Sequence, residues 1–430
     1  MLWQVICVSL SIAFLPGETE IASDRPILLR PARLIDGLDS EVHTGWSVLI
    51  RGNKIEAVGP GSAVLTPGDT QIVDLPDSTL LPGLIDAHTH VLLHPYNETL
   101  WDDQVLKEPL ALRVSRATNH LRSILESGFT TIRDLGTEGA GYADVGLKQA
   151  VEQKIIPGPR MIVTTRAIVA TGSYAPRGFA PELRIPQGAE EADGADLIRV
   201  VRDQVGRGAD WIKIYVDQWD PVNGGKPTFS VEEIRTVVET ANARGCPVVA
   251  HAMTLEGMKR ATLGGVRTIE HGDEGNEEVF SLMKQKGVAF CPTLAAAEAM
   301  EFYKGYKLGE APEPASLVQK RQSFRAALDA GVSIVNGSDM GVFAHGMGAR
   351  ELELMVDYGM KPAAAIQSAT SVAAGELGLG SRLGKINPGF EADLVAVEGN
   401  PLNEMSAIRK VRLVVKQGQI VHYPTKDSRP

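Results

Sequence analysis

Short apolar runs alternate with helix-like stretches along the middle of the chain, between residues 84 and 384. Each run has the length of one buried strand, and the stretches between the runs carry apolar residues at helical spacing. The runs are LIDAHTH, FTTIRDLG, RMIVTT, WIKIYVD, PVVAHA, RTIEHG, VAFCPT and SIVNGSD. Eight runs, each followed by helical sequence, predict an α/β fold built as a (β/α)8 TIM barrel; a doubly wound sheet is the alternative.

One of the predicted helices, in SVEEIRTVVETANARG at residues 230–245, carries signals at both ends. Ser230, followed three residues later by Glu233, predicts a capping box at the start of the helix. Gly245 predicts its end, because glycine readily takes the left-handed backbone that closes many helices.

Both ends of the chain show a second pattern, in which β-type runs are joined by Gly, Asp and Pro. Before the barrel these runs are ILLRPARLIDG, GWSVLIRGNKIEAVG and TQIVDLPDSTLLPG, and after it they are FEADLVAVEGNP and VRLVVKQGQIVHY. We therefore predict one small β-sandwich composed of residues 24–83 and 385–430, with the barrel spanning residues 84–384.

The first residues form an apolar run from Leu2 to Leu15, followed by Pro16 and Gly17. This run is too short for a membrane span and fits the apolar region of a secretory signal. We predict a signal peptide over residues 1–23 and export to the periplasm or the medium. An N-terminal core strand or a misassigned start are the alternatives, because no Lys or Arg precedes Arg25; the protein would then be cytoplasmic.

Composition narrows the function classes. Hydrophobic residues make up 43% and charged residues 22%, as in ordinary globular proteins. The net charge of -10, with no basic block, argues against a nucleic-acid or membrane partner. Cys246 and Cys291 lack a C-x-x-C partner and are expected to be buried, unreactive thiols.

Polar residues that can bind metal ions stand at the ends of several predicted strands. In a (β/α)8 barrel the carboxyl ends of the strands meet at one mouth, where catalytic groups lie. Residues two apart on a strand point to the same side, so His88 and His90 can hold one ion together. The full set is His88 and His90 on the first strand, Lys213 on the fourth, His251 on the fifth, His271 on the sixth and Asp339 on the eighth. Imidazole and carboxylate suit zinc and similar divalent ions.

Lys213 is the unusual member, since an ammonium group repels a cation. Burial lowers the pKa of a lysine, and the neutral amine can take up carbon dioxide to form a carbamate that bridges two ions. His251 and His271 would complete the ligands of the second ion. Asp339 could ligate one ion and accept a proton. Alternatively, an unmodified Lys213 pairs with a carboxylate and leaves a site for one metal.

The segments LPGLIDAHTH, WIKIYVD, VVAHA, TIEHG and NGSD resemble the amidohydrolase superfamily. The similarity is greatest to its binuclear, carboxylated-lysine branch, which is called imidazolonepropionase-like and includes Xaa-Pro dipeptidases, zinc carboxypeptidases and ochratoxinase-type enzymes. It covers nearly everything after Ile27, and six ligand positions in the right order make a specific signal.

The resemblance implies two Zn²⁺ or similar ions per chain, bridged by N6-carboxylated Lys213. It assigns His88, His90, Lys213 and Asp339 to the more buried ion, and Lys213, His251 and His271 to the more exposed one. A metal-bridging hydroxide would attack the carbonyl, and Asp339 would carry the proton to the leaving amine. The resemblance also implies a homo-oligomer.

Four further residues are candidates for catalysis or substrate binding. Tyr215 follows Lys213 on the same strand face, where its phenol could stabilise an oxyanion or bind substrate, or belong to the core. Tyr174 and Arg177 lie on a Gly-rich loop after the third strand, where some relatives have a histidine. Arg177 could bind a substrate carboxylate or be a solvated surface residue. His345, on the loop after the eighth strand, either contacts substrate or lies on the surface.

The sequence therefore predicts a metal-dependent hydrolase that cleaves the amide bond of dipeptides or N-acyl amino acids with a free carboxylate. Carboxypeptidase, dipeptidase and ochratoxin-type amidase activities all fit, with a small molecule or dipeptide as substrate. A one-metal deaminase or cyclic-amide hydrolase of the imidazolonepropionase type is the alternative enzyme class. A third alternative is a catalytically silent relative, although none of the expected ligands is missing.

Overall fold

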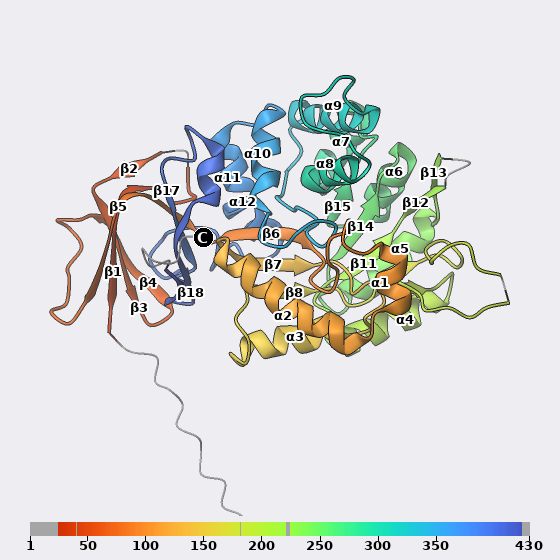
Figure 1. The fold of residues 1–430 in the computed structure, drawn as a ribbon, viewed down its shortest axis with the longest axis horizontal. Coiled ribbons are helices and arrows are strands. Elements are labelled where there is room, and N and C mark those ends of the chain that lie inside the picture. Colours follow the sequence, from red (N-terminus) through yellow and green to blue (C-terminus); the bar gives the residue numbers. More distant parts are fainter. Residues whose placement is uncertain (1–24, 40, 181, 221–223, 424–430) are drawn as a thin grey trace, which may run out of the picture.

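The computed structural model describes residues 25–39, 41–180, 182–220 and 224–423. The predicted signal segment, residues 1–23, lies outside the described residues. Figure 1 shows a sheet of long strands at one side of the molecule and, beside it, a larger unit of strands surrounded by helices. Within the described chain, no helix is both long and apolar enough to cross a membrane.

The larger unit contains parallel strands at seven of the eight predicted places. One sheet has the order β6-β7-β8 and the other β10-β9-β11-β14-β15-β16. Adjacent strands within each sheet are parallel. The strands are β6 (Leu84–Thr89), β7 (Phe129–Asp134), β8 (Arg160–Val163), β9 (Ile168–Val169), β10 (Glu190–Glu191), β11 (Ile212–Tyr215), β14 (Val248–Ala252), β15 (Thr268–His271) and β16 (Ala289–Cys291).

The eighth predicted run, SIVNGSD at residues 333–339, does not form a regular strand. It is nevertheless hydrogen-bonded on both sides: Val335 N–H donates to Phe290 O (2.8 Å), and Ala87 N–H donates to Asn336 O (2.9 Å). The expectation of a full strand was wrong: the segment pairs with its neighbours only through isolated bridges, Ile334 with Phe290 and Met340 with Thr89, and the φ of 63° at Asp339 ends the extended backbone. The segment connects β16 to β6 and carries Asp339 to the ends of the neighbouring strands.

Helices connect the parallel strands and cover them on the outside (Figure 1). The capping box of α5 is present, since Ser230 Oγ accepts from Glu233 N–H and Glu233 Oε2 accepts from Ser230 N–H. The helices are α1 (Trp101–Lys107), α2 (Leu110–Glu126), α3 (Ala143–Glu152), α4 (Asp196–Gly206), α5 (Val231–Asn242), α6 (Leu255–Gly264), α7 (Glu277–Lys286), α8 (Leu294–Tyr303), α9 (Ala315–Ala330), α10 (Ala349–Asp357), α11 (Pro362–Ser368), α12 (Ser371–Glu376) and the 3-10 helix η1 (Met405–Arg409). A hairpin, β12 (Asp217–Asp220) and β13 (Gly224–Pro227), follows β11.

The two ends of the chain meet in one eight-stranded sheet, with red strands from the start and blue strands from the end in Figure 1. The path runs β19-β18-β17-β5-β1-β3-β4, and β2 pairs with β1. Its centre is the antiparallel pair of β5 and β17, in which Leu80 lies opposite Ala396. The strands are β1 (Ile27–Leu34), β2 (His43–Thr44), β3 (Trp46–Arg51), β4 (Lys54–Pro60), β5 (Gln71–Pro82), β17 (Leu394–Glu398), β18 (Val411–Lys416) and β19 (Gln419–His422).

A buried ion cluster joins this sheet to the parallel strands. Arg160, at the start of β8, contacts Glu391 and lies 3.3 Å from Asp393 Oδ2, just before β17. Burial raises the pKa of the Asp393 carboxyl, and the Arg160 guanidinium opposes that rise. The arginine therefore compensates two carboxylates that have lost most of their contact with water.

We expect Arg160→Met to lower the free energy of unfolding by about 3 kcal/mol, because it removes the cation nearest to the buried Asp393 and leaves Glu391 with Arg382 alone. Denaturant unfolding followed by tryptophan fluorescence measures the loss. The control is Arg30→Met, which removes an exposed pair with Asp74 and should cost less than about 1 kcal/mol. Equal losses in the two variants would contradict this account of the junction.

Candidate metal centre

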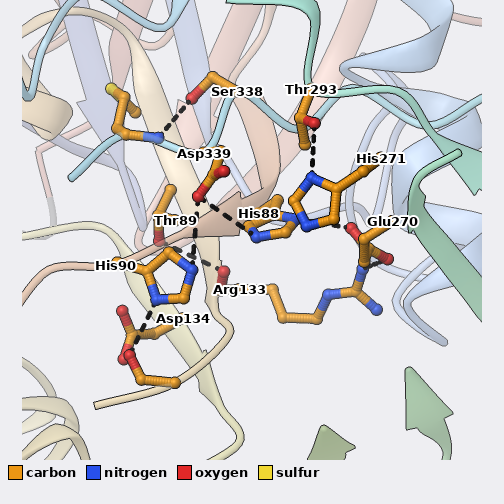
Figure 2. A network of polar contacts seen from close by, with 12 residues as sticks. His88, Thr89, His90, Arg133, Asp134, Glu270, His271, Thr293, Ser338 and Asp339 are labelled. Carbon is orange, nitrogen blue, oxygen red and sulfur yellow. Dashed lines mark hydrogen bonds and ion pairs between the residues drawn. The ribbon is translucent and has the colours of Figure 1, made fainter. Parts of the chain in front are cut away.

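Two histidines and one aspartate converge where β6 ends. Asp339 Oδ1 lies 3.4 Å from His88 Nε2 and 3.4 Å from His90 Nε2, as Figure 2 shows. The rings of His88 and His90 are 5.3 Å apart between centroids, on the same side of the strand. The spacing of two residues therefore brings both imidazoles to one carboxylate, as the sequence predicts.

Two more histidines extend this group across β14 and β15. The ring of His271 lies 5.0 Å from that of His88 and 4.5 Å from that of His251. A hydrogen bond of 2.9 Å joins His271 Nδ1 to Thr293 Oγ1, so the other ring nitrogen remains available for a ligand (Figure 2). His251 stacks on the ring of Tyr215, with centroids 4.5 Å apart.

Lys213 completes the set predicted from the sequence. Its side chain comes from β11 and is 0% exposed. Within the described part of the chain, its Nζ is buried and has no hydrogen-bond partner. Burial lowers the pKa of this amine, against the attraction of Glu270 and Asp339. A buried amine without an acceptor is rare in proteins, because such a group normally costs free energy.

The electrostatics of the cluster favour neutral imidazoles. Burial lowers the pKa of all four histidines, and nearby Lys213 lowers it further for His88 and His251. Burial also raises the pKa of the Asp339 carboxyl, against the effect of Lys213. Neutral imidazole is the form that ligates metal ions.

Backbone strain is concentrated at the same place. Three residues without glycine's freedom adopt left-handed backbone: His271 with φ 73°, Asp339 with φ 63° and Thr293 with φ 50°. Such conformations cost about 1 to 3 kcal/mol each and persist where the surrounding structure enforces them, often at functional sites. Here the left-handed backbone sets the direction of two candidate ligands, His271 and Asp339, and of the Thr293 hydroxyl that is hydrogen-bonded to His271.

A buried ion pair supports His88 from behind. Glu270 Oε2 lies 2.8 Å from His88 Nδ1, and Glu270 Oε1 accepts a hydrogen bond of 2.9 Å from Arg133 (Figure 2). Both Glu270 and Arg133 are 0% exposed. This contact orients the ring so that Nε2 faces Asp339. Sequence analysis missed both residues, although a charged residue within each apolar run was a visible signal.

The residues of this cluster fit divalent metal ions. In two groups of three residues, the ligand atoms all lie within 4.8 Å of one another. One group is His88, His271 and Asp339, and the other is His88, Glu270 and Cys291. Two members of the first group, His271 and Asp339, line the cavity described below. The unpartnered Nζ of Lys213 also fits, because a carbamate would replace an unsatisfied amine with two ligand oxygens.

A cavity of about 590 Å³ opens next to the cluster. His251, His271 and Asp339 line its floor, and side chains from α8 and α9 line its wall. Tyr96, Met253, Ala296, Met300 and Val342 contribute apolar surface. The volume lies within the range of small-molecule sites, so the cavity can hold a substrate beside the candidate ligands.

Tyr215 and Tyr174 form an aromatic wall around a buried acid. Glu138 accepts hydrogen bonds from Tyr174 Oη (2.8 Å), Tyr215 Oη (3.3 Å) and Trp101 Nε1 (2.9 Å). The phenol of Tyr215 is therefore directed to Glu138 in this structure. Sequence analysis missed Glu138, because a glutamate on a loop gives no local sign of three converging donors.

Arg177 and His345 lie away from the cavity floor. Arg177 is exposed on the loop after β9, and neither residue is among the described residues that line the cavity. His345 Nε2 lies 3.2 Å from the backbone oxygen of His90, and its ring stacks on His120 at 3.9 Å. His345 thus backs a candidate metal ligand from outside the cavity.

Parallel strands with histidines and an aspartate converging at their carboxyl ends are the arrangement expected of the amidohydrolase class. The Amidohydrolase family model matches residues 79–421, and the chain therefore belongs to this family. Members of the family generally bind metal ions. The family assignment supports hydrolysis of C–N bonds.

Several relatives show how far this similarity extends. The chain is 30% identical to an ochratoxinase from Aspergillus niger over 366 residues, covering 78% of this chain and 73% of the relative. It is 24% identical to the imidazolonepropionase of Deinococcus radiodurans, covering 91% and 94%. A crystal structure of a Xaa-Pro dipeptidase with bound methionine in the active site is similar with a TM-score of 0.81 and 31% identity, covering 92% and 99%.

We expect Glu270→Gln to weaken zinc binding by about 10- to 100-fold, since the amide is a poorer acceptor for the N–H of His88 and for Arg133. Competition with a chelator of known affinity measures the change. The control is Glu278→Gln, at an exposed position on α7. Unchanged zinc affinity in Glu270→Gln, with the fold intact by circular dichroism, would contradict the role given to Glu270.

Proposed function

We propose that this protein is a binuclear metal-dependent amidohydrolase that cleaves the amide bond of dipeptides or N-acyl amino acids with a free carboxylate. The observation that carries the proposal is the buried Lys213 amine, which has no hydrogen-bond partner within the described residues and lies amid four histidines and Asp339. A carbamate on Lys213 would satisfy this amine and supply the oxygens that two ions need.

The residues divide into two ligand groups. His88, His90, Lys213 and Asp339 would hold the inner ion, and Lys213, His251 and His271 the outer one. When bound, two Zn²⁺ or similar ions would polarise the scissile carbonyl and lower the pKa of water to about 7.

Asp339 acts as the proton carrier. It lines the cavity and lies 3.4 Å from His88 and His90, so its carboxylate stands where water and substrate meet. It accepts a proton from water as the water oxygen bonds to the carbonyl carbon. It then donates that proton to the amide nitrogen as the C–N bond breaks, which yields a carboxylic acid and a free amine.

The substrate class rests on the cavity and on the relatives. Apolar side chains from several elements give room for a hydrophobic acyl or amino-acid group. The names of two relatives, ochratoxinase and a Xaa-Pro dipeptidase with bound methionine, support an amide bond next to an amino-acid carboxylate.

The proposed fold includes a closed barrel. Residues 84–384 form a closed (β/α)8 barrel, supported by the bonds of segment 333–340 to both β16 and β6. The described residues within the predicted bounds 24–83 and 385–430 belong to the second domain, a β-sandwich. Export through residues 1–23, a homo-oligomeric state, and the absence of nucleic-acid and membrane partners complete the proposal.

A one-metal deaminase or cyclic-amide hydrolase is the second candidate. The similarity to imidazolonepropionase over 91% of the chain favours it. That alternative requires Lys213 to stay unmodified, as a buried ammonium group among histidines whose Nζ has no hydrogen-bond partner within the described residues. The number of ions per chain separates the two candidates.

We expect Lys213→Ala to reduce zinc from two ions per chain to one or fewer, and to abolish amide hydrolysis. Elemental analysis and assay of the same samples test this, with Lys286→Ala, on an exposed part of α7, as the control. Acetate or propionate should partly restore both readouts, because a free carboxylate can enter the space left by the carbamate. One ion in the parent protein would favour the deaminase.

The function itself is tested by release of amino acids from dipeptides and N-acyl amino acids. Metal-loaded protein should release the carboxyl-terminal amino acid, and prior chelation should abolish release until zinc is returned. Chromatography of the products measures both. No release from any substrate by protein shown to contain zinc would contradict the proposal.

A further inference from the structure

We propose that Lys320 is the cation that binds the carboxylate of the substrate, an inference that rests on the proposed function and names its specificity residue. Lys320 lies in α9, outside the strands that carry the candidate ligands. Its side chain nevertheless reaches the same cavity of about 590 Å³ as His271 and Asp339.

The position of the ammonium group is fixed by two contacts. Lys320 Nζ donates to the backbone oxygen of His271 (2.8 Å) and contacts the carboxylate of Asp273. The residue is only 3% exposed. An ammonium group has three N–H donors, so these two contacts leave one for a ligand in the cavity.

The charges around the cavity make this cation distinctive. Among the described lining residues, five are acidic: Asp217, Asp273, Glu274, Glu301 and Asp339. Such a lining repels a carboxylate unless a cation stands beside it. The other lysine in the lining, Lys304, has a 64% exposed side chain and pairs with Glu301 at 2.8 Å. Lys320 is thus the buried cation of the lining.

The distance to the reaction centre also fits. In an N-acyl amino acid, the carboxylate carbon lies two bonds, about 2.5 Å, from the scissile nitrogen. A cation that binds this carboxylate must therefore stand close to the ligands. Lys320 meets this condition, because its Nζ is hydrogen-bonded to the backbone of the candidate ligand His271. Buried, charge-assisted contacts of this kind are strong.

Lys320 also has a structural task that the experiment must separate from binding. Ser323, one turn later in α9, donates to Gly272 O at 2.5 Å, so the helix holds two successive carbonyl groups at the end of β15. If this clamp were the whole role of Lys320, its loss would lower activity equally for substrates with and without a carboxylate. Loss of a carboxylate anchor lowers activity only for the substrates that carry a carboxylate.

The test compares N-acetyl-L-leucine with N-acetyl-L-leucinamide as ligands, and the corresponding acyl amino acid and its amide as substrates. In zinc-loaded parent protein, calorimetry should show that the acid binds more tightly than the amide. Lys320→Met should weaken acid binding and raise KM for the acid by about 10- to 100-fold, with little change for the amide. Lys320→Arg should keep most of the preference.

Two variants complete the design. Lys307→Met removes a lysine with a 79% exposed side chain outside the cavity and should leave binding unchanged. Arg177→Met tests the other proposed anchor. The inference would be overturned if the preference for the acid over the amide were lost in Arg177→Met but kept in Lys320→Met. A preference for the acid that survives in Lys320→Met, because the carboxylate binds zinc directly, would overturn it as well.

A failure of the proposed carboxylate binding can be distinguished from a failure of the proposed hydrolysis. If the parent protein binds the acid through Lys320 but releases no amino acid, the proposed function is wrong and the anchor stands. If the parent protein binds acid and amide equally, the anchor is overturned, whatever the hydrolysis assay shows. Zinc content and thermal unfolding of Lys320→Met identify a variant that has lost its fold, and Lys320→Arg then decides.

Discussion

The burial of the Lys213 amine is the constraint on which the whole site depends. Strand β11 places this fully buried side chain among four imidazoles, and within the described residues no hydrogen-bond acceptor meets its Nζ. An ammonium group there would lose its hydration, and the attraction of Glu270 and Asp339 would offset only part of that cost. The neutral amine is also the form that reacts with carbon dioxide. The same burial that makes an ammonium unfavourable therefore favours the carbamate that we propose.

The candidate ligands around Lys213 are held by neighbouring groups, of which only Thr293 lines the cavity. Arg133 and Glu270 form a buried pair, and Glu270 fixes the ring of His88. His345 backs His90 through its carbonyl oxygen, and Thr293 fixes His271. A buried ion pair gives little net stability, but the loss of one member is costly. These supporting contacts therefore determine the orientation of the candidate ligands more than the stability of the fold.

Sequence patterns reached the candidate ligands because strands obey a simple rule. Alternation along β6 puts His88 and His90 on one side, and parallel strands end at the same edge, so the meeting of six side chains in one cluster could be predicted. The left-handed backbone of Asp339 could not, because it depends on tertiary contacts with β6, where Asp339 N–H donates to His88 O. Glu138 and Lys320 lie on a loop and a helix, and only tertiary packing brings them to the site.

Lys320 contacts both a candidate metal ligand and the cavity. Its ammonium group holds the carbonyl oxygen of His271, whose φ of 73° is unfavourable for a histidine, and it also lines the cavity. A carboxylate bound to Lys320 would share this ammonium with Asp273 and with the His271 carbonyl. Substrate charge and ligand geometry are then coupled through one group. Because α9 supplies that group, the outer helices contribute to specificity while the strands supply the chemistry.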